Sequence, residues 1–132
     1  MDHVNYNFTF LGLEVVPKGR PRFSKRGHTY TPAKTKLFES NLKHLFAHQM
    51  KRYGIEIFTS ALYLSITICV KKPKSVKRKY ISVRPDLDNY LKAILDAGNG
   101  VIFKDDGQVV ELCIKKQYAP ENSLQMILRE FD

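Results

Sequence analysis

The pattern of apolar and polar residues along the chain predicts a short series of strands and helices. Apolar residues recur from Leu87 to Leu95 at i, i+3, i+4, i+7 and i+8, the spacing of an amphipathic helix, and Gly98 and Gly100 follow where it should end. β-Branched and apolar residues fill positions 61–70, which is typical of a strand. In chain order, the expected elements are a strand at 5–16, a hairpin or ordered loop at 23–31, a helix at 32–53, a strand at 61–70, a helix at 87–97, and strands at 109–118 and 123–130.

This order predicts a small α/β fold in which one mixed β-sheet carries two helices. The first helix should have Thr31 as its N-cap and Pro32 at its first position, and Gly54 can end it. A length of 132 residues suits one domain that spans residues 1–132. The fold class expected from the sequence is therefore a single mixed-sheet domain with two helices.

Two further features of the sequence concern the setting of the protein. No apolar run reaches the length of a membrane span and no charged-then-apolar leader opens the chain, so we expect a cytoplasmic protein without a membrane partner. Cys69 and Cys113 both fall in apolar, strand-like runs and lack CxxC spacing. We therefore expect two buried thiols and neither a disulfide framework nor a zinc site.

The chain is strongly basic, with a formal net charge of +9 at pH 7. This charge favours a nucleic acid or another anionic surface as the partner, although it could also serve solubility alone. Residues 71–84 contain seven Lys and Arg and no acid, and a second basic cluster lies at 18–26. Such side chains position nucleic acid through its phosphates, and a solvated linker is the alternative for the first cluster. The candidate DNA-binding residues are Lys18, Arg20, Arg22, Lys71, Lys72, Lys74, Lys77, Arg78, Lys79 and Arg84.

The acidic residues are unevenly distributed, because six of the thirteen fall between Asp86 and Glu111. Carboxylates clustered in a cationic protein suggest a metal ion held against a polyanion. Asp86 is a candidate N-cap, Asp88 lies beside the apolar face of the helix, and the pair at 105–106 occupies a turn before a strand. We expect this turn to aim a carboxylate back at the helix start, so that three carboxylates meet on one or two Mg²⁺ ions. The alternative is that these acids only cap a helix and form a turn.

Lys92 stands in line with two of these acids. Asp88, Lys92 and Asp96 are spaced by four residues and therefore stack along one side of the expected helix. The catalytic interpretation places the Lys92 ammonium beside the scissile phosphate, where it would stabilise the charge of the transition state. The alternative is an ordinary i,i+4 ion pair on an exposed face.

Two motifs together resemble the signature of the RusA-type Holliday-junction resolvases, a family common in prophages. The first motif is RPDLDN at 84–89 with Lys92, Ala93 and Asp96, and the second is KDDGQV at 104–109. The resemblance extends to PKGRPR at 17–22 and YTP at 30–32, and so covers most of the chain.

The resemblance implies a homodimeric, Mg²⁺-dependent endonuclease, for which Mn²⁺ could substitute, that cuts four-way DNA junctions by paired nicks near the crossover. Matched by position, Asp86, Asp88 and Asp106 would be catalytic and bind the metal, with Asp105 as a further metal ligand, and Lys92 would be the catalytic lysine. Two other functions are open: a metal-dependent nuclease of other specificity, acting on flaps, forks or RNA, and a non-catalytic basic DNA-binding module.

Overall fold

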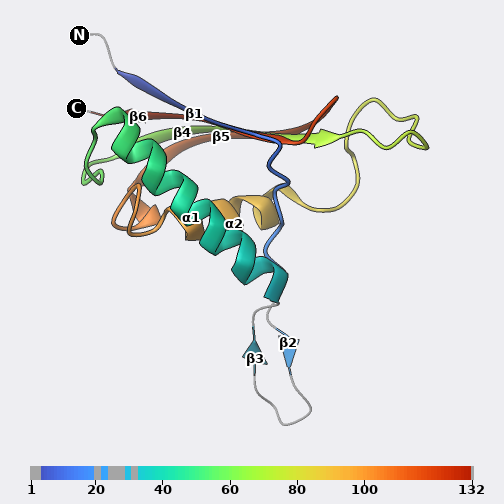
Figure 1. Cartoon of the computed structure of the whole chain (residues 1–132), viewed down its shortest axis with the longest axis horizontal. Coiled ribbons are helices and arrows are strands. Elements are labelled where there is room, and N and C mark those ends of the chain that lie inside the picture. The colour runs from blue at the N-terminus through green and yellow to red at the C-terminus, as the bar shows by residue number, and fades with distance from the viewer. Residues whose placement is uncertain (1–3, 20–21, 24–28, 31–32, 132) are drawn as a thin grey trace.

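The computed structural model describes residues 4–19, 22–23, 29–30 and 33–131. Within these ranges, two long helices and four long strands account for most of the chain (Figure 1). The elements in order are β1 (Asn5–Leu11), β2 (Arg22–Phe23), β3 (Thr29–Tyr30), α1 (Ala33–Tyr53), β4 (Leu62–Lys71), α2 (Leu87–Gly98), the 3-10 helix η1 (Asp106–Gln108), β5 (Val109–Ala119) and β6 (Ser123–Glu130).

The four long strands form one mixed sheet in the order β1-β6-β4-β5. β6 pairs antiparallel with β1 and with β4, whereas β4 and β5 are parallel. Parallel neighbours need a crossover connection, and α2 is the helix of that crossover. Both helices lie on the same face of the sheet, and no helix of the described residues covers the other face (Figure 1). β2 and β3 pair with each other in a separate two-stranded sheet.

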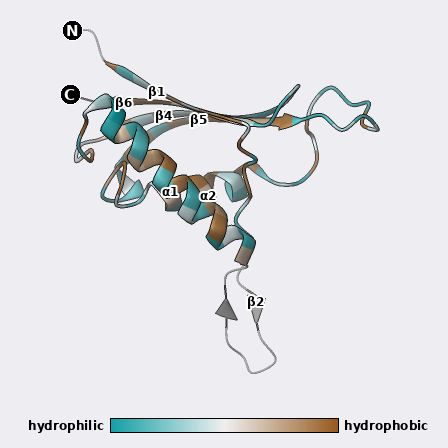
Figure 2. Ribbon diagram, viewed as in Figure 1, coloured by the Kyte–Doolittle hydropathy of each residue, from teal (hydrophilic) through white to brown (hydrophobic). Residues whose placement is uncertain are grey.

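The core lies between the sheet and the two helices. Alternate residues of β4 point to the helices and are fully buried, among them Leu64 and Ile66. In α1 the buried positions recur every four residues along one side, whereas its other side is polar. Figure 2 shows hydrophobic and hydrophilic residues along each helix. The buried apolar residues of α1 are Phe38, Leu42, Phe46 and Met50.

The structure confirms the expected α/β fold, with a mixed sheet and two helices in the expected order. The first strand is shorter than expected and ends at Leu11, because Gly12 follows with φ +77° and turns the chain out of the sheet. Thr31 and Pro32 lie outside the described residues. No described helix is long and apolar enough to cross a membrane.

One expectation about the cysteines was wrong. Cys69 is buried, but Cys113 is exposed. Cys113 lies in register with Ser65 on the face of the sheet that carries no helix. The apolar run around Cys113 therefore does not bury its thiol, because β5 is an edge strand with one uncovered face.

Candidate active site

The start of α2 presents two exposed carboxylates. Asp86 precedes the helix as its N-cap with φ −71° and ψ 150°, yet its side chain makes no capping hydrogen bond. Asp88 lies in the first turn, and both residues are exposed. The positive end of the helix dipole favours negative charge at this place. The two carboxylates are therefore accessible to a ligand from solvent.

A lysine on β5 fixes the segment that leads into α2. Lys116 lies on the helix-covered face of the sheet, in register with Ile68, and its ammonium donates to the carbonyl oxygens of Val83 (2.8 Å) and Pro85 (2.7 Å). Asp86 is therefore held at the level of Lys116 on β5. Our sequence interpretation missed this role, although a lysine in phase with Leu112 and Ile114 on one strand face was a signal for a buried partner.

Hollows flank Asp86 on two sides. One has a volume of about 490 Å³, and Lys18 and Asn89 line it together with Asp86 and Arg84. The other has a volume of about 650 Å³ and is lined by Arg84, Asp86 and Lys116 among others. Asp86 therefore lines two hollows, each with basic side chains at its wall.

The second pair of acids lies in the tight turn before β5. Asp105 is the N-cap of η1, where its carboxylate accepts from the Gly107 N–H at 2.8 Å, while the Gln108 side chain accepts from the Asp105 N–H at 3.1 Å. The Gln108 amide also donates to the carbonyl oxygens of Phe58 (2.9 Å) and Ser60 (3.0 Å), just before β4. Asp105 and Gln108 therefore shape and anchor the turn, and Asp106 is the half-buried carboxylate that this turn presents.

Within one chain, these two pairs of acids do not meet. Helix α2 has 12 residues and is therefore about 18 Å long. Asp86 lies at the level of Lys116, whereas the turn lies just before Val109, seven residues earlier on β5, which is about 23 Å along the strand. The described residues contain no group of three or more His, Cys, Asp or Glu that could hold a metal ion.

We expected this turn to aim a carboxylate at the start of α2, and within a single chain that expectation was wrong. In a crossover between parallel strands, the helix runs back along the sheet, so the strand that follows starts beside the C-terminal end of the helix. Asp105 and Asp106 consequently lie near the end of α2 and not near its start. The assignment of these four acids as metal ligands stays a prediction.

Lys92 is on an exposed part of α2, with 59% of its side chain accessible. Its ammonium lies 2.9 Å from the Asp96 carboxylate, one helical turn onward. Burial alone would raise the pKa of Asp96, but hydrogen bonds and charge from Lys18 and Lys92 outweigh burial and hold this pKa below its ordinary value. Asp96 therefore stays ionised, and it holds Lys92 along the same side of the helix as Asp88.

We expected Lys18 to bind a phosphate, but in the structure it forms ion pairs with two carboxylates. Its ammonium contacts Asp96 on α2 and lies 3.0 Å from Glu39 on α1, and its side chain is largely buried. Burial would lower the pKa of Lys18, but these two carboxylates raise it above the ordinary value. The positive charge of Lys18 is thus already compensated by these two carboxylates, and its side chain links α1 to α2. Arg20 lies outside the described residues, and Arg22 is described only as part of β2.

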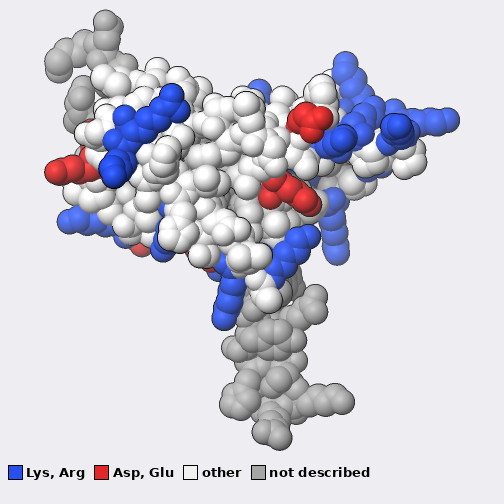
Figure 3. All heavy atoms as spheres, viewed as in Figure 1, with Lys and Arg blue, Asp and Glu red and all other residues white. Residues whose placement is uncertain are grey.

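The other expected DNA-binding residues form an exposed basic loop, residues 71–84, between β4 and α2. The loop projects beyond the end of the sheet, and Figure 3 shows basic side chains gathered there. Tyr118 on β5 supports it, since Lys72 and Arg78 lie 5.6 Å and 5.9 Å from the centre of its ring. None of the loop's cations has an ion-pair partner within the described ranges. The basic members of the loop are Lys71, Lys72, Lys74, Lys77, Arg78, Lys79 and Arg84.

Comparisons with known proteins identify the family of the chain. The chain matches the model of the family described as Endodeoxyribonuclease RusA over residues 13–129. It is also similar to the uncharacterized protein YqaN of Bacillus subtilis (strain 168), with 36% identity over 138 aligned residues that cover 93% of this chain and 94% of that protein. Because the family match spans most of the sequence, the chain belongs to the RusA family of endodeoxyribonucleases.

Proposed function

We propose that this protein is a Mg²⁺-dependent endodeoxyribonuclease that resolves four-way (Holliday) DNA junctions by paired, symmetric nicks as a homodimer. Membership of the family supports endodeoxyribonuclease activity. The observation that carries the proposal is that the exposed basic loop leads directly into Asp86 and Asp88. A backbone phosphate bound by the loop would therefore lie beside two carboxylates.

The acids at the start of α2 suit a magnesium ion. Mg²⁺ prefers hard oxygen ligands and is usually held by one or two carboxylates together with waters and substrate phosphate. Asp86 and Asp88 supply two exposed carboxylates that carry no ion pair within the described residues. When bound, the metal would polarise the scissile phosphate and supply the water nucleophile, and Mn²⁺ could substitute for Mg²⁺.

A second copy of the chain would supply the remaining acid. By the lengths of α2 and β5, the turn at Asp106 lies about 20 Å from Asp86 in its own chain, so a third carboxylate beside Asp86 and Asp88 would come from another chain. In a two-fold symmetric dimer, the partner subunit's Asp106 could approach Asp86 and Asp88, and the reverse contact would form at the other site. Two such sites, related by the same symmetry as a four-way junction, would account for paired nicks on opposed strands.

The chain's own residues then have distinct roles. Asp86 and Asp88 would ligate the metal, and Lys92 would stabilise the developing charge on the phosphate. Asp96 would position Lys92, because it is itself anchored by Lys18. The basic loop would hold phosphates on either side of the cut without reading sequence.

Replacement of Lys92 by alanine should lower the rate of junction cleavage about a hundredfold, as for loss of one transition-state charge partner. Lys92→Arg should restore little activity, because the guanidinium is larger and planar. Single-turnover cleavage at saturating enzyme measures the effect apart from DNA binding. Wild-type turnover in Lys92→Ala would leave the lysine only its ion pair with Asp96.

The function itself is tested by cleavage of a labelled four-way junction, a fork and a linear duplex of matched sequence. We expect nicks at symmetric positions in two opposed strands of the junction with Mg²⁺ and none with EDTA. Equal cleavage of fork or duplex would favour a nuclease of other specificity. Binding without cleavage of any substrate would favour a non-catalytic DNA-binding module.

A further inference from the structure

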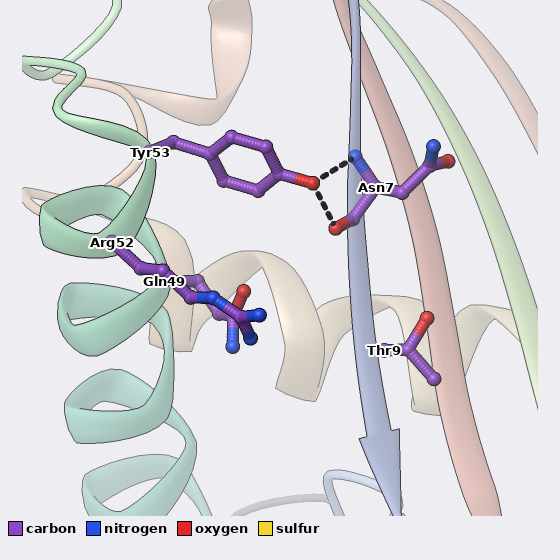
Figure 4. A pocket seen from close by; sticks show the side chains of 5 residues that line it. All are labelled: Asn7, Thr9, Gln49, Arg52 and Tyr53. Atoms are coloured by element: carbon purple, nitrogen blue, oxygen red, sulfur yellow. Dashed lines mark hydrogen bonds between the residues drawn. The ribbon is translucent and has the colours of Figure 1, made fainter.

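Two tyrosines are exposed among the described residues, and the first of them, Tyr53, has a structural role. Tyr53 ends α1, and the centre of its ring lies 5.4 Å from that of Tyr6 and 5.9 Å from that of Phe8. Its hydroxyl donates to the Asn7 carbonyl (2.8 Å) and accepts from the Asn7 N–H (3.2 Å), as Figure 4 shows. Ring and hydroxyl together fasten the end of α1 to β1, which accounts for this aromatic side chain.

The second, Tyr80, has no comparable role within the described part of the chain. It lies in the basic loop and is 72% exposed. Its ring pairs with no other described aromatic ring, and its hydroxyl makes no hydrogen bond to a described residue. The Lys79 ammonium lies 5.5 Å from the centre of the ring. Because packing in the core does not explain this ring, it is available to a ligand.

The basic loop is anchored at both of its ends, so it presents Tyr80 from a defined position. At its start, the Lys71 N–H donates to the side-chain oxygen of Asn122 (2.8 Å), in the turn between β5 and β6. At its end, the Lys116 ammonium holds two backbone carbonyl oxygens. Between these anchors, Tyr118 contacts two of the loop's cations. A loop that is already held in place loses less conformational freedom when it binds a ligand.

Tyr80 stands beside the candidate active site. Its carbonyl oxygen accepts from the Ser82 N–H at 2.9 Å, so the chain turns sharply at Ile81. From Ile81 onward, the loop lines the hollow of about 650 Å³ that also contains Asp86. Tyr80 and Asp86 are six positions apart in the sequence. They therefore lie within about 20 Å of each other, which is less than one turn of duplex DNA (about 34 Å).

The walls of this hollow are of two kinds. Ile81, Val83 and Leu87 are apolar, whereas Arg84 and Lys116 are basic. Phosphates need only the basic side chains, because they are bound through their charge. Apolar walls and an aromatic ring suit the flat, less polar face of a nucleobase. The combination therefore fits a nucleotide through its base as well as through its phosphate.

An exposed aromatic ring on a cationic surface binds nucleic acid by stacking. Every nucleobase has a π-face, which stacks on an aromatic side chain whatever the sequence. In a duplex these faces are covered by neighbouring bases, and a base must leave the stack before a side chain can take its place beside it. Leaving costs least where pairing or stacking is already interrupted, as at the branch point of a junction. Such a ring therefore favours branched over linear DNA.

We propose that Tyr80 stacks on a nucleobase that is unstacked at the branch point, within one helical turn of the phosphate cut at Asp86 and Asp88. The proposal rests on the proposed function and deepens it, because it names a residue that selects branched DNA. Lys79 would contact the phosphate of the same nucleotide, since its ammonium already lies beside the ring. Tyr80 thus determines specificity and is separate from the residues that would hold the metal.

Tyr80→Ala should weaken binding of a four-way junction about tenfold, because stacking on an aromatic side chain contributes about this much per base. Tyr80→Phe should bind like the wild type, since it keeps the ring. Binding of a linear duplex should change little in either variant, because its bases stay stacked. The control is Val4→Ala, an exposed apolar residue at the opposite end of the sheet from the basic loop (Figure 1), which should bind both DNAs normally. Gel shifts in EDTA measure all of these affinities.

A thermodynamic cycle tests the contact itself. An abasic nucleotide is placed in turn at each position within about six nucleotides of the crossover, which is about 20 Å at 3.4 Å per nucleotide. At one position, loss of the base should weaken binding by the wild type about tenfold. It should not weaken binding by Tyr80→Ala further, because ring and base stabilise the complex only together. Equal effects of every abasic position on the wild type and on Tyr80→Ala would overturn the contact.

Salt dependence separates a base contact from a phosphate contact. Lys79→Ala should lower the slope of log affinity against log salt concentration by about 0.9, as for loss of one phosphate contact. Tyr80→Ala should leave this slope unchanged, because stacking releases no counterions. A lowered slope in Tyr80→Ala would mean that the ring acts through the phosphates, and it would overturn the proposal.

All of these measurements are made without Mg²⁺, so they do not depend on cleavage. Coupling between Tyr80 and one base in a protein that cleaves no junction would support the base contact and overturn the proposed function. Symmetric cleavage of the junction by a protein that shows no coupling would support the proposed function and overturn the base contact.

Discussion

Each of the single replacements Asp86→Asn, Asp88→Asn and Asp106→Asn should reduce Mg²⁺-dependent junction cleavage by about a thousandfold or more. The amide keeps the size of the side chain but removes the charge that holds the metal, and a metal ion contributes several kcal/mol to stabilising the transition state. None of the three carboxylates makes a hydrogen bond or ion pair within the described residues, so the fold should persist. Binding of junction DNA in EDTA should be unchanged or tighter, because repulsion of the phosphates is reduced.

The matched control for these variants is Glu121→Gln. Glu121 is an exposed acid in the turn between β5 and β6, with no hydrogen bond in the described part of the chain, and its loss changes the net charge equally. Circular dichroism, a gel shift in EDTA and cleavage in Mg²⁺ should be compared for all four variants. Near wild-type cleavage by the three aspartate variants would remove the metal-site assignment.

The elements of the fold were predictable where the signal is local. α2 was recognised from apolar residues on one side and from the glycines at its end, and the structure places it within one residue of the expected bounds. The end of β1 was not predictable from apolar residues alone, because residues 13–16 continue the apolar pattern after leaving the sheet. The turn at Gly12 decides that boundary through its positive φ.

The identities of the candidate acids could be read from the sequence, but their arrangement could not. Asp106 was expected near Asp86 because a turn just before a strand can aim a side chain back at the start of the helix. Whether they meet depends on the direction of the strand that follows α2, and β5 is parallel to β4. Sequence spacing carries no information about this direction, and in the structure the two pairs of acids lie at opposite ends of α2.

The role of Lys18 was hidden for a similar reason. Its neighbours in sequence are basic, and this composition favours a phosphate contact. Its neighbours in space are Glu39 and Asp96, which are contributed by two different helices. Only the packing of α1 beside α2 brings these carboxylates together, and they turn a surface cation into a structural one.

The central claim, a catalytic site shared between two copies, is tested most directly by mixing two inactive variants. If each site takes Asp88 from one chain and the partner's Asp106 from the other, a mixed dimer of Asp88→Asn and Asp106→Asn contains one intact site and one site with both changes.

The measurement is nicking of a labelled four-way junction after the variants are mixed and allowed to exchange, with mixed dimers verified by differently tagged chains. About half of the dimers would be mixed and would carry one good site of two, so nicking should return to about a quarter of the wild-type rate, without paired resolution. This is a rise of at least a hundredfold over either variant alone. If mixed dimers form and the junction stays uncut, each chain holds its own complete site, and the shared site is contradicted.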